Sequence, residues 1–96
     1  MKSHLAPNLE ARIKSIIRDM LNDYNVEIRS VKIAEDWSGD EAIFVELWYK
    51  SNQREFDPKL IGTVMSTVHS MLVDNGEDRF AYINHHLPEG QKLKVA

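Results

Sequence analysis

Apolar residues recur at helical spacing in two segments of the chain, and each segment predicts an amphipathic helix. The first helix is expected over residues 8–24, with Asn8 as its N-cap because the side-chain oxygen can accept from a free backbone N–H. The second is expected over residues 57–75, since Asp57 followed by Pro58 is a strong helix start. The two apolar stripes are Leu9, Ile13, Ile16, Ile17, Met20, Leu21 and Tyr24, then Leu60, Ile61, Val64, Met65, Val68, Met71 and Leu72.

Three further segments alternate apolar and polar residues with a period of two, which predicts strands. The expected strands are residues 26–34, 42–50 and 79–87. In the first of them the alternation changes phase between Ile28 and Val31. Either a bulge lies near Ser30, or the two halves of the strand bury opposite faces.

The order helix, strand, strand, helix, strand predicts an α+β fold. We expect a two-layer α-β-β-α-β sandwich, with two helices on one face of a three-stranded mixed sheet. The first two strands form an antiparallel hairpin, and the helix before the third implies a crossover. Residues 1–96 are expected to form one domain. Residues 88–96 are its expected tail, in which the stretch KLKV is a candidate edge strand.

Helices on one face leave the other face of the sheet open. If Ile43, Val45 and Leu47 point toward the helices, the alternate positions point away from them. The aromatic residues expected on the open face are Phe44, Trp48, Phe80 and Tyr82, with Arg79 at the rim. An exposed patch of this kind marks an interface. The tail, part of the first strand or a second copy of the chain is the expected cover, ahead of a ligand or a different partner.

Composition narrows the classes of function. The chain has no cysteine, which excludes disulfides and thiolate metal sites. Twelve Lys and Arg against fifteen Asp and Glu give a net charge of −3, which disfavours general binding to a phosphate backbone. No apolar run approaches the length of a membrane span, and the N-terminal stretch lacks the pattern of a signal peptide. We therefore expect a cytoplasmic protein that does not associate with membranes.

The hairpin turn carries a cluster of acidic residues around a tryptophan. The candidate acidic loop site consists of Trp37, Asp36, Asp40 and Glu41. Gly39 suits a turn because it adopts positive φ without strain. The stretch that begins at Asp36 does not follow the calcium-loop order, since its glycine is fourth and its twelfth residue is Leu47. No metal or other cofactor is predicted; the loop is a solvated turn or a docking point for a basic partner.

The four histidines, at positions 4, 69, 85 and 86, lack the spacing of known zinc motifs. His85 and His86 are adjacent on a strand and must point to opposite faces. An enzyme would require Asp36 or Asp40 to meet one of them as a carboxylate and imidazole pair for acid–base chemistry. No nucleophile or substrate pocket is indicated, and no catalytic residue is predicted.

Two resemblances bear on function. The α-β-β-α-β layout is similar to that of KH-like RNA-binding domains, although no Gly-x-x-Gly loop joins two helices here. The stretches DWSGD at 36–40 and GEDRFAY at 76–82 resemble a small bacterial α+β family with an Asp-Trp-x-Gly-Asp hairpin turn and no assigned function. That resemblance implies that the two loops belong together.

These patterns favour a small protein-interaction module that is not an enzyme. It would use the aromatic sheet face to self-associate, most simply as a homodimer, or to join a bacterial complex as an accessory subunit. RNA binding on the same face is the alternative, and an enzyme with a carboxylate and histidine pair is the third hypothesis.

Overall fold

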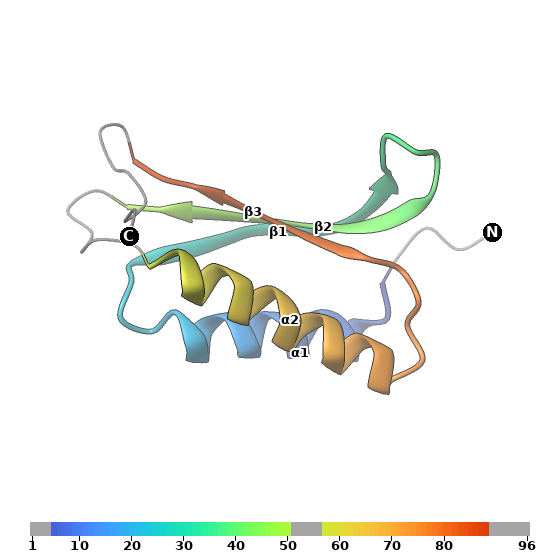
Figure 1. The fold of residues 1–96 in the computed structure, drawn as a ribbon, viewed down its shortest axis with the longest axis horizontal. Helices are drawn as coiled ribbons and strands as arrows, with labels where there is room; N and C mark the ends of the chain where they lie inside the picture. The colour runs from blue at the N-terminus through green and yellow to red at the C-terminus, as the bar shows by residue number, and fades with distance from the viewer. Residues whose placement is uncertain (1–4, 51–56, 89–96) are drawn as a thin grey trace.

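The protein is an α+β sandwich in a computed structural model, which describes residues 5–50 and 57–88. The elements in chain order are α1 (Pro7–Met20), β1 (Val26–Glu35), β2 (Glu41–Tyr49), α2 (Pro58–Asp74) and β3 (Ala81–His86). Figure 1 shows the sheet as one layer and the two helices as the other. The expected fold class is confirmed.

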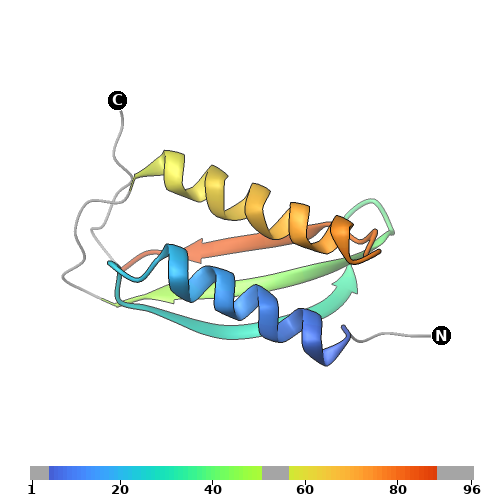
Figure 2. The same cartoon turned by 90° about the horizontal axis from the view of Figure 1, so that it is seen from below.

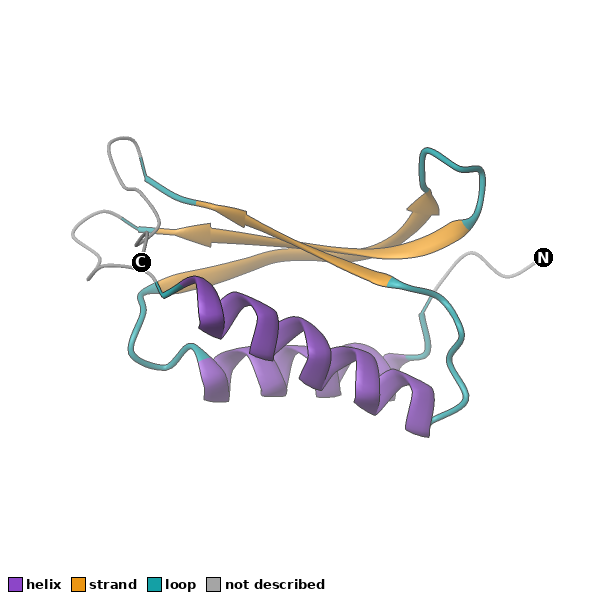
Figure 3. Ribbon diagram, viewed as in Figure 1, coloured by secondary structure: helices purple, strands orange, loops and turns teal. Residues whose placement is uncertain are grey.

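The sheet has the order β1-β2-β3, so β2 is its central strand. β1 pairs with β2 in the antiparallel sense, and β3 pairs with β2 in the parallel sense after the crossover through α2. Figure 2 shows both helices running along the same face of the sheet, with α1 on the β1 side and α2 on the β3 side. The opposite face, which we call the outer face, carries no helix (Figure 3).

The ends of the helices differ in part from the expectation. α1 begins at Pro7, and Ala6 occupies the N-cap position without a side-chain hydrogen bond. The prediction of Asn8 as N-cap was therefore wrong, because Pro7 already takes the first helical position. The helix also stops at Met20 rather than at residue 24: Leu21 leaves helical geometry, and the Tyr24 N–H donates to its carbonyl in a turn.

α2 begins as its sequence predicts. Asp57 is the N-cap, and its side chain accepts from the backbone N–H of Lys59 at 2.9 Å. Pro58 occupies the first turn, where its missing N–H costs no hydrogen bond. Gly76 follows the helix with a φ of 78°, a conformation that favours glycine.

The phase change in β1 is produced by a bulge. Ile28 pairs with Leu47 and Ser30 pairs with Glu46, so Arg29 is the extra residue. With one residue added, Ile28 and Val31 lie on the same face of the sheet and both pack against the buried core. The first of the two alternatives is thus the observed one.

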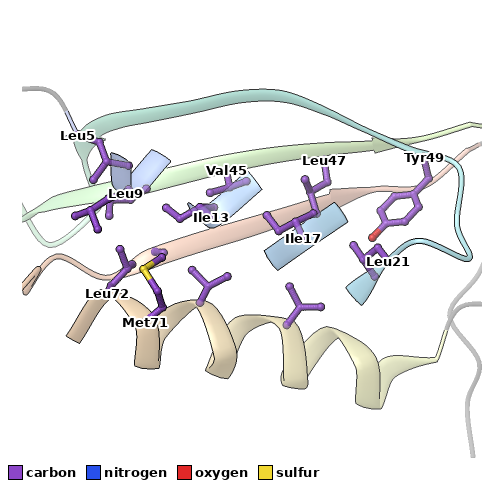
Figure 4. Close-up of a cluster of buried hydrophobic side chains, with 14 residues drawn as sticks. Leu5, Leu9, Ile13, Ile17, Leu21, Val45, Leu47, Tyr49, Met71 and Leu72 are labelled. Carbon is purple, nitrogen blue, oxygen red and sulfur yellow. The ribbon is translucent and has the colours of Figure 1, made fainter. Parts of the chain in front are cut away.

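The core lies between the sheet and the helices, as Figure 4 shows. Ile13 and Ile17 of α1 and Val45 and Leu47 of β2 are completely buried. Burial of such side chains contributes about 1.5–3 kcal/mol each to folding. No helix within residues 5–50 and 57–88 is long and apolar enough to cross a membrane. Nearly all of the expected tail, with its KLKV stretch, lies outside the described residues, as does His4.

Candidate functional site

The outer face of the sheet carries a group of aromatic side chains. Phe44 and Tyr82 pair across β2 and β3, and their rings stack with centroids 5.3 Å apart. Phe80 lies next to Tyr82, at 4.7 Å between centroids. Trp48 occupies the other end of β2, on the same face. Phe80 and Trp48 are each 39% exposed, so no described segment of the chain covers this face completely.

The hairpin tip adds a further ring to this group. Trp37 lies 5.0 Å from the ring of Tyr82 and is 83% exposed. The indole of this predicted acidic loop residue thus lies on the outer face of the sheet. We use the term aromatic face for the set Trp37, Phe44, Trp48, Phe80 and Tyr82.

Asp36 holds the tip in its conformation. Its Oδ1 accepts from the Ser38 N–H at 2.9 Å, from the Ser38 hydroxyl at 2.7 Å and from the Asp40 N–H at 3.1 Å. The hydrogen bond from the Ser38 hydroxyl is the main cause that lowers the pKa of Asp36. Gly39 adopts a φ of 91° within this turn. The Asp36 carboxylate is therefore engaged in stabilising the turn.

The hairpin tip and the loop between α2 and β3 lie at the same end of the molecule (Figure 1). The Tyr82 hydroxyl donates to Asp36 Oδ2 at 3.3 Å. Arg79 donates to Glu77 at 2.8 Å and to Glu41 at 3.2 Å, which joins the two loops. The DWSGD and GEDRFAY stretches thus belong together, as the resemblance implied.

Arg79 is held firmly by these contacts. Its hydrogen bond with Glu77 is the main cause that raises the pKa of Arg79. The sequence predicted Arg79 at the rim of the open face. The structure pairs its guanidinium with the carboxylates of Glu77 and Glu41.

The two loops enclose a hollow of about 870 Å³. Phe80 and Tyr82 line one side of it, so the hollow opens directly onto the aromatic face. Its carboxylates are Asp36, Asp40, Glu41, Glu77 and Asp78, and its guanidinium is that of Arg79. The predicted acidic loop residues Asp36, Asp40 and Glu41 lie at the rim, while Trp37 stands beside it.

A carboxylate and imidazole pair is present, but it differs from the pair considered from sequence. Glu46 Oε1 and His86 Nε2 lie 2.6 Å apart on the outer face, and Asn84 donates to the other Glu46 oxygen at 2.8 Å. Partial burial raises the pKa of Glu46, yet these hydrogen bonds outweigh it and hold the pKa below its ordinary value. Asp36 instead contacts Tyr82, four residues away from His86 along β3.

Sequence reasoning missed this pair because the strand order was unknown. In the sequence, Glu46 and His86 occupy the same alternate strand positions as the aromatic residues. This alternation was the available indication that both side chains lie on the outer face. Their contact follows only once β3 is placed beside β2 in parallel register, with Glu46 opposite Asn84.

Trp48 contacts one side chain from each of the two strands that flank β2. The His86 ring lies 4.2 Å from it and nearly parallel, and the Arg29 guanidinium lies 4.4 Å from the ring centroid. This distance is within the range of a cation–π contact. The bulge residue Arg29 thus covers one part of the aromatic face, and Trp48 still remains partly exposed.

The two adjacent histidines point to opposite faces, as predicted. His85 faces the helices, with its Nδ1 2.8 Å from the Tyr49 hydroxyl. Burial lowers the pKa of His85 to about 4. Across residues 5–50 and 57–88, no group of three or more histidine, aspartate or glutamate side chains is arranged to hold a metal ion.

Comparison of this chain with protein-family models, with curated proteins and with solved structures finds no match. The aromatic face and the hollow at its end are the features of the described residues that bear on function.

Proposed function

We propose that this chain is a protein-binding module that docks another protein on its aromatic face. The observation that carries the proposal is the exposure of large apolar rings on a sheet face without a helix layer. Exposed aromatic groups with polar neighbours are typical of interaction surfaces. Phe44, Trp48, Phe80 and Tyr82 form the contact surface in this proposal, with Arg79 at its rim.

The occupant is either a second copy of the chain or a different protein, for which this chain serves as an accessory subunit. Binding is proposed in preference to catalysis. The hollow beside the aromatic face contains carboxylates that are hydrogen-bonded within the loops, and no hydroxyl nucleophile with an adjacent histidine base lines it.

RNA binding on the same face is a weaker proposal on electrostatic grounds. Aromatic rings can stack on bases, but five carboxylates lie at one end of this face. Those charges repel a phosphate backbone.

The test compares two double variants of the tagged chain by quantitative affinity purification from the organism that encodes it. Trp37→Ala/Trp48→Ala removes two exposed rings of the aromatic face. Met65→Ala/Val73→Ala is the matched control, because these side chains are 41% and 56% exposed on α2. Light scattering of the purified chains reports association between copies.

We expect the first variant to lose a partner, or the dimer, that the wild type and the α2 variant retain. Truncation of a ring that acts as an interface hot spot typically costs about 2 kcal/mol or more of binding free energy, which is about a thirtyfold loss of affinity. Equal recovery of every partner by both variants, with no association between copies, would contradict the proposed function.

A further inference from the structure

The partner that fits the aromatic face is defined by the charges at its end. We propose that the aromatic face docks a basic segment of a partner protein, with an arginine or lysine side chain in the hollow between the two loops. This inference rests on the proposed function and specifies the chemistry of the occupant.

The charges that line the hollow do not balance. Five carboxylates line the hollow, and Arg79 is the cation among its lining residues. Arg79 is already shared between Glu77 and Glu41. Asp36, Asp40 and Asp78 form no ion pair with any residue of the described ranges 5–50 and 57–88. A cation from a partner would complement this end of the face.

Aromatic rings and carboxylates lie within one continuous surface. Phe80 and Tyr82 belong to the aromatic face and also line the hollow. Trp37 extends this apolar surface and is almost fully exposed. A segment that carries a basic residue next to an apolar one could therefore place the cation among the carboxylates and the apolar group on the rings.

This surface already holds two guanidinium groups of its own chain. Arg29 stacks on Trp48 at 4.4 Å, and Arg79 is seated between carboxylates of the two loops. These contacts show that both the rings and the acidic end accommodate the planar guanidinium group. A basic side chain of the partner would make the same two kinds of contact, with a ring and with carboxylates.

A second copy of the chain fits this end less well. The chain has a net charge of −3, so a partner copy brings an excess of acidic groups. An occupant of opposite charge is favoured at the hollow and would be attracted over a longer range at low salt.

The test is a selection of a phage-displayed random 12-residue peptide library on the immobilised full-length chain. The most enriched peptide is then synthesised, and its affinity is measured by titration calorimetry at low and high salt. Asp40→Asn/Asp78→Asn removes two of the five negative charges of the hollow without altering Asp36, which holds the turn. Glu10→Gln/Asp19→Asn is the matched control, since it removes the same charge from α1 on the opposite layer.

We expect the selected peptides to be enriched in arginine or lysine next to an apolar residue. Their affinity should fall at least tenfold in Asp40→Asn/Asp78→Asn, change less than twofold in the α1 variant and weaken as salt is added. Trp37→Ala should also weaken binding. Circular dichroism and thermal melting verify that each variant is folded.

The remaining outcomes separate the two proposals. Peptides that require Trp37 and Trp48 but show no basic enrichment would overturn the basic partner and leave the proposed function standing. Basic peptides that bind the Asp40→Asn/Asp78→Asn chain equally well would also overturn it. A selection that yields no peptide dependent on the aromatic face, from a chain that does not self-associate, would count against both.

Discussion

His85 illustrates how the position of one residue in the fold determines its chemistry. It lies opposite Leu47 in the pairing of β3 with β2 and faces the helix layer. Its ring contacts the buried Tyr49, whose hydroxyl is 2.8 Å from Nδ1. Burial is the main cause that lowers the pKa of His85 to about 4, and the neighbouring His86 adds to it. The imidazole is therefore neutral in the folded protein at neutral pH.

A stability change with pH follows from this pKa. The unfolded chain protonates His85 near its ordinary pKa of 6.5, while the folded chain does so near 4. The unfolded state thus binds more protons between these values, and the free energy of unfolding falls as pH drops from 6.5 to 4. The full pKa shift corresponds to a change of about 3 kcal/mol in the free energy of unfolding. Solvent screening of the partly exposed ring reduces the expected change to about 1–2 kcal/mol.

Urea denaturation from pH 7 to pH 4 measures this effect when the wild type is compared with His85→Asn. The variant should lose the part of the pH dependence that falls between pH 6.5 and 4. Identical slopes for wild type and His85→Asn would contradict the assignment of a buried neutral imidazole.

At the scale of elements, the bulge in β1 explains an irregular sequence. Without Arg29, the order of apolar and polar residues from Val26 to Ile33 would be a regular alternation. The bulge absorbs one residue, so both halves of the strand keep their apolar side chains toward the helices. Arg29 is then free to reach the outer face and stack on Trp48.

Deletion of Arg29 should therefore be tolerated. The shortened strand keeps Ile28 opposite Leu47 and Ser30 opposite Glu46, now as a regular ladder. We expect a loss of only about 1–2 kcal/mol in the free energy of unfolding, mainly from the contacts of Arg29 with Trp48 and with Glu27. Chemical denaturation followed by circular dichroism provides the measurement.

Deletion of Lys32 is the matched control. It removes a residue from the regular part of β1 and moves one half of the strand to the opposite face. That chain should be unfolded or destabilised by more than about 3 kcal/mol, because several partly buried apolar side chains of β1 lose their contacts with the core at once. If the two deletions lowered the free energy of unfolding equally, the bulge would not be the feature that keeps both halves of β1 facing the helices.

The sequence predicted the type and order of every element within the described residues, because the periods of 3.6 and 2 are local properties. It also supplied the start of α2, since Asp57-Pro58 is a local signal that the structure retains. The end of α1 could not be read in the same way. Tyr24 continues the apolar stripe, but Asn22 and Asp23 favour a turn, and the helix ends before them.

At the scale of the whole molecule, the site depends on contacts between distant segments. Sequence alternation placed Phe44, Trp48, Phe80 and Tyr82 on one face. It could not place β3 beside β2 in parallel register. That pairing brings Glu46 to His86 and brings the loop after α2 to the hairpin tip. The acidic hollow results from this long-range arrangement, which is why its residues were only partly anticipated.

The chain contains its own reporter of the aromatic face. It has two tryptophans, Trp37 and Trp48, and both belong to that face. Indole emission therefore reports directly on whether a bound protein covers the surface. Trp37 is the more sensitive of the two, because it is 83% exposed against 39% for Trp48.

Acrylamide quenching of tryptophan fluorescence, with and without a saturating partner that itself lacks tryptophan, tests the central claim most directly. The partner is the protein recovered by the affinity comparison or the peptide obtained from the selection. Docking on the aromatic face predicts a shift of emission to shorter wavelength and at least a twofold fall in the quenching constant. A partner that binds at saturation while both tryptophans remain as accessible as in the free chain would contradict the account.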